Sequence, residues 1–64
     1  MNIKIEEDVN ILINLFKTLN FTQVISKGKK ILKKNPEYII LYNIIGSAYQ
    51  NIGDFSLAKE IFSK

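Results

Sequence analysis

A spacing of 34 residues recurs along this chain and sets the frame for its fold. Asn20-Phe21 and Asp54-Phe55 both pair a polar, capping-type residue with a phenylalanine, and they stand 34 residues apart. The same spacing separates three further apolar pairs: Ile11 and Ile45, Leu15 and Tyr49, and Val24 and Ala58. Self-similarity at a fixed period of 20–50 residues is the signature of a repeat architecture. We therefore expect two copies of one structural unit.

Each copy contains two segments with helical periodicity, which we place at 5–19, 21–34, 37–52 and 55–64. Their apolar residues recur three and four positions apart, as on one face of an α-helix. Asn20 is the expected N-cap of the second helix, with Gln23 as its capping-box partner. Pro36 disfavours helical geometry at Asn35 and should end that helix.

The third segment is apolar on nearly all sides, because only Asn43 is polar between Tyr38 and Ile45. Such a helix should be buried on several sides, which predicts a central position. Gly53 supplies a stop, Asp54 should cap the fourth helix, and that helix has no stop signal before Lys64. The predicted fold is all-α, with two antiparallel helix hairpins stacked as a short solenoid.

The second copy resembles a tetratricopeptide repeat. That family has the pattern W-x2-L-G-x2-Y, then a glycine, then A-x3-F, with a proline closing each repeat. The matching residues are Tyr42 in place of the tryptophan, Ile45, Gly46, Tyr49, Gly53, Ala58 and Phe62, with Pro36 closing the preceding repeat. The small residues Gly46 and Ala58 would let the two helices of the repeat approach closely.

The first copy departs from the family pattern at four positions. Asp8 stands at the tryptophan position, Leu12 at the small glycine, Leu19 at the turn glycine and Gly28 where phenylalanine is expected. Terminal repeats are often atypical. We interpret the chain as one domain, 1–64, with a degenerate repeat over 5–36 and a second, truncated repeat over 37–64.

The resemblance implies protein binding on a concave surface lined by the first helix of each repeat. Carried onto this sequence, the partner-binding residues are Val9, Asn10, Ile13, Phe16, Lys17, Ile40, Asn43, Ile44, Ser47 and Gln50. Their apolar members would form a contiguous patch, and such patches usually mark interaction sites. Two other interpretations stay open: these residues belong to the core in a shifted register, or they pair with a second copy.

Self-association is a second expectation, because repeat arrays need about three repeats and a polar capping helix to stand alone. Barely two repeats are present here, so another copy or further chain should cover the open end. Ile61 and Phe62 are the residues expected at that contact. The chain would then be a homo-oligomer or part of a longer protein.

Catalytic and metal-binding functions have little support. The chain has no His, Cys or Arg, and its carboxylates stand mostly at helix starts, where capping explains them. We therefore predict no enzymatic activity and no cofactor, although a non-catalytic N-terminal module of a larger enzyme is an alternative.

All the positive charge comes from lysine, and the net charge is +3. Lys27, Lys30 and Lys34 form a candidate basic patch on the second helix, which offers nucleic-acid or acidic-partner binding as an alternative function. A solvated helix face is the simpler interpretation of these lysines. Arg, the usual residue for bidentate phosphate contacts, is absent, and no aromatic residue interleaves the patch.

The location expected from the sequence is cytoplasmic. The first apolar stretch, 9–16, follows three acidic residues, unlike a secretory signal. No run approaches the ~20 apolar residues that span a bilayer. We expect no membrane association.

Overall fold

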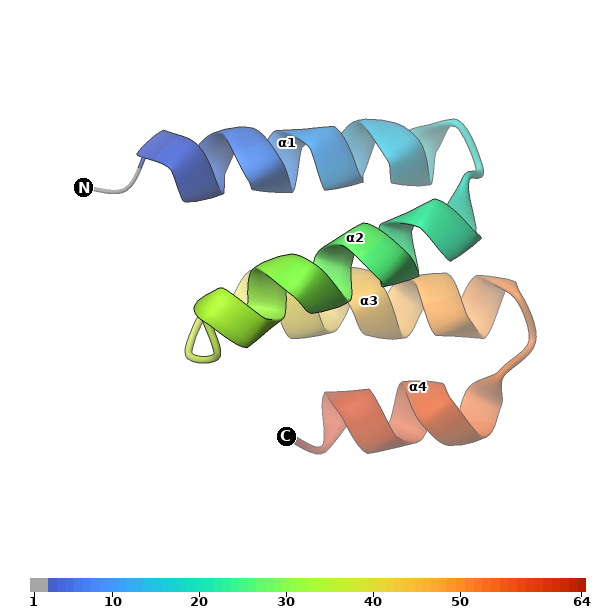
Figure 1. The fold of residues 1–64 in the computed structure, drawn as a ribbon. Helices are drawn as coiled ribbons and strands as arrows, with labels where there is room; N and C mark the ends of the chain where they lie inside the picture. The colour runs from blue at the N-terminus through green and yellow to red at the C-terminus, as the bar shows by residue number, and fades with distance from the viewer. Residues whose placement is uncertain (1–2) are drawn as a thin grey trace.

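Four α-helices make up the fold in a computed structural model, which describes residues 3–64. They are α1 (Ile3–Lys17), α2 (Phe21–Lys34), α3 (Ile39–Asn51) and α4 (Phe55–Phe62), and no strand occurs within this range. Consecutive helices run antiparallel, so α1–α2 and α3–α4 form two hairpins that stack side by side (Figure 1). The all-α prediction is confirmed.

The helix ends follow the 34-residue period. The first residues of α2 and α4, Phe21 and Phe55, are 34 positions apart, as are the last residues of α1 and α3, Lys17 and Asn51. The bounds predicted for the second helix are confirmed. The other three helices differ from their predicted bounds by about two residues at one or both ends.

The turn inside each hairpin has the same backbone geometry. Leu19 and Gly53 occupy matching positions with positive φ angles of 65° and 84°. In the first turn the amides of Leu19 and Asn20 donate to the carbonyls of Phe16 and Leu15, at 3.0 and 2.9 Å. In the second turn, the matching amides of Gly53 and Asp54 donate to Gln50 and Tyr49, at 3.1 and 2.9 Å. This is the Schellman arrangement that closes helices, and it ends α1 two residues before the predicted Leu19.

The helix that follows each turn begins differently. The Asp54 carboxylate accepts a hydrogen bond from the Leu57 amide at 3.2 Å, so it caps α4 as predicted. Asn20 makes no side-chain cap, and its Nδ2 atom instead donates to the Thr18 hydroxyl at 2.6 Å. The capping box predicted for Asn20 and Gln23 is therefore wrong.

The turn between the hairpins shortens α3 relative to its predicted start at Glu37. Tyr38 is extended and serves as the N-cap residue, so α3 begins at Ile39. The Tyr42 hydroxyl donates a hydrogen bond to the Pro36 carbonyl oxygen and ties this turn to the helix. On the other side of the turn, the Asn35 side chain donates to the Ile31 carbonyl at 3.0 Å and closes α2.

Helix α3 is central, as its apolar sequence predicted. It contacts α1, α2 and α4, whereas α1 and α4 lie at opposite edges of the stack (Figure 1). The buried apolar residues are Ile5, Val9, Leu12, Val24, Leu41, Ile45, Ala48, Tyr49 and Ala58. Four of these nine come from α3, so that helix supplies much of the core that joins the two hairpins.

Each hairpin has a glycine at a close helix contact. A Cβ atom on Gly46 would overlap the Phe62 ring, so the glycine of α3 makes room for the phenylalanine of α4. In the first hairpin the glycine is on the other helix. A Cβ atom on Gly28 would lie 2.8 Å from Ile45 of α3 and 3.7 Å from Leu12 of α1. The large and small residues are thus exchanged between the two hairpins.

Candidate partner-binding surfaces

A groove of about 300 Å³ lies between α1 and α3, the first helices of the two hairpins. Its lining residues are Ile13, Phe16, Lys17, Asn43, Ile44 and Ser47, and we call this set the groove. All six belong to the ten partner-binding residues predicted from the sequence. The structure therefore brings together side chains from two hairpins that are about 30 positions apart in the chain.

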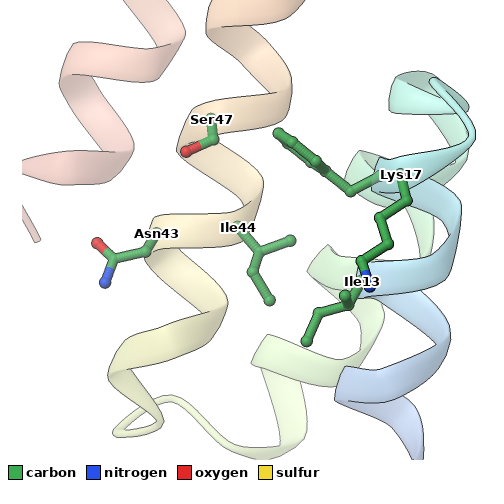
Figure 2. A pocket seen from close by; sticks show the side chains of 6 residues that line it. Ile13, Lys17, Asn43, Ile44 and Ser47 are labelled. Atoms are coloured by element: carbon green, nitrogen blue, oxygen red, sulfur yellow. The ribbon is translucent and has the colours of Figure 1, made fainter.

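Two isoleucines form the floor of the groove. Ile44 points from α3 towards Ile13 of α1, and both are half-buried against the core (Figure 2). Phe16 is held at one side, because its ring meets the ring of Phe21 edge-on with centroids 5.1 Å apart. The apolar part of the groove thus rests on well-packed side chains.

The polar residues of the groove lie around this floor. Lys17 is exposed and carries the one charge among the six lining residues. Asn43 and Ser47 come from α3, one turn apart (Figure 2). Amide and hydroxyl groups can both donate and accept hydrogen bonds, so they suit a peptide backbone. Chemically, the groove can hold an apolar side chain and hydrogen-bond the chain that carries it.

The other four predicted partner-binding residues lie elsewhere. Val9 is only 7% exposed and packs in the core with Leu12 and Leu41, so it does not line the groove. Ile40 lines a separate hollow at the start of α3, and Asn10 is exposed on α1. Gln50 lines a hollow on α4. The predicted patch is therefore interrupted, because α1 turns Val9 towards α3 rather than towards solvent.

A second surface lies at the α4 edge of the stack. A hollow of about 440 Å³ is lined by Gln50, Phe55, Ala58, Lys59, Phe62 and Ser63, and we call it the end surface. Phe55 is 68% exposed and Phe62 is 43% exposed. Of the two predicted self-association residues, Phe62 is in the end surface, while Ile61 is half-buried against the cluster of Ile45, Tyr49 and Ala58.

Sequence reasoning missed Phe55 and Lys59 as members of the end surface. The sequence predicts for Phe55 a place after a cap and a match with Phe21, but no surface role. The available signal was the match of Phe16 with Gln50, because Phe16 is the ring partner of Phe21 and Phe55 has no aromatic residue at that position. Lys59 carried no signal of its own.

The predicted basic patch lies on the α2 surface beside α1. Lys27, Lys30 and Lys34 are exposed, and Lys30 lines two adjoining hollows. Both hollows also include the half-buried Asp8, which forms an ion pair with the exposed Lys4 at 3.7 Å. Surface pairs of this kind contribute little to stability. The patch is therefore mixed in charge rather than purely basic.

No group of three or more His, Cys, Asp or Glu side chains within residues 3–64 is placed to hold a metal ion. None of the four helices is both long enough and apolar enough to cross a bilayer, over the same part of the chain.

Compared with protein-family models, curated proteins and solved structures, the chain matches none of them. The tetratricopeptide resemblance therefore rests on the residues and helix arrangement described above.

Proposed function

We propose that this chain is a protein-interaction module of the tetratricopeptide type, which binds a partner peptide or helix in the groove between α1 and α3. The observation that carries the proposal is the position of the groove. It joins the first helices of the two hairpins, where the resembled family has its concave binding surface, and an apolar floor lies open there.

The stacking of the helices supports the family assignment. α3 packs against both helices of the first hairpin, so each hairpin contacts its neighbour directly. Nearest-neighbour stacking of this kind is what a helical solenoid requires. The matching helix ends and matching turns give the two hairpins one common plan.

The composition of the groove indicates the kind of partner. Ile13 and Ile44 favour an apolar anchor side chain, and Lys17 favours a carboxylate near it. A short segment with one large apolar residue next to an acidic residue or a C-terminal carboxylate has this chemistry.

Selection of binding peptides from a random displayed library, followed by titration of the selected peptide, tests the proposal. The groove variants are Lys17→Glu and Ser47→Glu, which place like charge against a partner carboxylate and leave the buried core untouched. We expect each to weaken binding by about tenfold or more. Lys33→Glu is the matched control, because Lys33 is exposed on α2 and lies outside the groove.

Circular dichroism of each variant checks that the helices are retained. A selected peptide that binds the groove variants and the control equally well would contradict the groove as the binding site. Failure to select any peptide above background would contradict the proposed function itself.

A further inference from the structure

The end surface on α4 has a counterpart, position by position, in the first hairpin, and α3 packs across part of that counterpart surface. Each of its six residues has a counterpart 34 positions earlier. In chain order these counterparts are Phe16, Phe21, Val24, Ile25, Gly28 and Lys29. The chain therefore shows, in its own first hairpin, what packs on a surface built this way.

Contacts with α3 run across this surface of the first hairpin. A Cβ on Gly28 would touch Ile45, and Ile25 packs against the cluster that contains Ile45 and Tyr49. The Lys29 ammonium lies 5.5 Å from the centre of the Tyr49 ring, a cation–π contact. Val24 is fully buried. The natural cover for this kind of surface is thus one α-helix with an apolar face.

We propose that the end surface is a docking site for an amphipathic α-helix of a partner protein, laid across α4 as α3 is laid across α2. This site is separate from the groove, and neither Gln50 nor any other residue of the end surface lines the groove. Docking there would cover Phe55 and Phe62, which are exposed in the chain alone.

The exchange of large and small residues specifies one feature of the docked helix. In the first hairpin, Ile45 fits because position 28 is glycine. The matching position on α4 is Phe62, which carries a Cβ atom where Gly28 has none and whose ring lies against Gly46 of α3. The docked helix must therefore carry a small residue, alanine or glycine, where α3 carries Ile45.

Lys59 specifies a second feature of the docked helix. It replaces Ile25, which packs in the first hairpin against the cluster that contains Tyr49. Lys59 is the only ionisable residue that lines the end surface, so its charge has no counterpart among the other five residues there. An acidic residue four positions after the small one, where α3 carries Tyr49, would complement it. The docked helix thus has a small residue and, four positions later, an acidic residue.

A second copy of this chain fits the end surface poorly. End-to-end stacking would lay α1 of the second copy where a third hairpin would begin. The residues of α1 that match Leu41 and Ala48 of α3 are Glu7 and Asn14. Leu41 and Ala48 are both fully buried, and burying Glu7 or Asn14 in their place without partners is unfavourable.

The test uses the full chain and two fluorescent synthetic peptides of residues 37–52. In both peptides Ile39→Lys and Ile40→Lys give solubility, because these two side chains are exposed on α3 and are not core residues. One peptide is otherwise unchanged, and the other also carries Ile45→Ala and Tyr49→Glu. Fluorescence anisotropy measures the affinity of the chain for each.

We expect the Ile45→Ala, Tyr49→Glu peptide to bind at least about tenfold more tightly than the unchanged one. Phe55→Ala and Lys59→Ala in the chain should each weaken it by about fivefold or more. Ile52→Ala is the matched control, because Ile52 is exposed but does not line the end surface, and it should leave the affinity unchanged.

Three outcomes would overturn the proposal. In the first, the two peptides bind equally or not at all. In the second, Lys17→Glu weakens binding as much as Phe55→Ala, which would place the peptide in the groove. In the third, sedimentation equilibrium of the chain alone shows a dimer that Phe55→Ala dissociates, which would make a second copy the occupant.

Discussion

The two hairpins of this chain have the same plan but place their glycines on opposite helices. In α1–α2, the large residue Leu12 stands on the first helix and Gly28 on the second. In α3–α4, at positions 34 residues later, Gly46 stands on the first helix and Phe62 on the second. Gly46 makes room for Phe62 within its own hairpin, whereas Gly28 makes room mainly for Ile45 of α3.

The two hairpins also differ in what covers them. Leu12 is fully buried, because α3 lies across the first hairpin, whereas Phe62 at the matching contact is 43% exposed. The large and small pair is therefore enclosed in one hairpin and open on one side in the other. The same exchange should be tolerated in the open hairpin and not in the enclosed one.

Exchanging the large and the small residue within each hairpin should give the largest difference in stability between the two hairpins. Leu12→Gly with Gly28→Phe should abolish folding, because Ile45 already occupies the space beside position 28. We expect a loss of about 5 kcal/mol, which is the whole stability of a small domain. Gly46→Leu with Phe62→Gly should keep the fold within about 1–2 kcal/mol. Urea unfolding followed by circular dichroism measures both.

The single variants of each swap are its controls, since Gly46→Leu alone meets the Phe62 ring and should be less stable than the double variant. Equal stability of the two double variants would show that α3 does not enclose the first pair.

Truncating the large residue of each pair should give a smaller but clear difference in the free energy of unfolding. Leu12→Ala removes a fully buried side chain and should cost about 2–5 kcal/mol. Phe62→Ala should cost about 1–2 kcal/mol, because nearly half of that side chain already contacts solvent. The same urea titration ranks the two. A larger loss for Phe62→Ala would mean that the open hairpin contributes more to the core than its burial indicates.

Substitutions in the two turns should give the smallest difference in stability. Leu19 adopts a positive φ that glycine adopts without strain, so Leu19→Gly should stabilise the chain by about 0.5–1 kcal/mol. Gly53→Leu should destabilise it by about 1–2 kcal/mol for the same reason. Thermal unfolding by circular dichroism measures both changes. Leu19→Ala is the control, because alanine keeps the Cβ and should bring no gain.

The sequence predicted the helices well where a local signal marks their ends. Pro36 placed the end of α2 correctly, and its start at Phe21 was also predicted, although Asn20 makes no side-chain cap there. The start of α3 was missed, because the Tyr42–Pro36 hydrogen bond that holds the turn is not a local pattern. The end of α1 was missed because Leu19 takes a conformation that the identity of a leucine does not indicate.

The candidate site was predicted in part. Helical periodicity and the family resemblance placed six residues in the groove, but they could not decide how far α1 is rotated about its axis. That rotation buries Val9. The departures at Leu12 and Gly28 are neighbours in the core, although the close contact at Gly28 is with Ile45 of α3. A sequence pattern that is compared one position at a time does not show which of its departures are neighbours in the fold.

The position of α4 has a consequence for local unfolding. Within residues 3–64, α4 contacts α3 alone, whereas α3 contacts all three other helices. The last hairpin can therefore open by detaching one eight-residue helix while the remaining three stay packed. A helix docked on the end surface would hold α4 closed, since any ligand that binds only the closed state shifts the equilibrium towards it. Amide hydrogen exchange in α4 would then report occupancy of the surface.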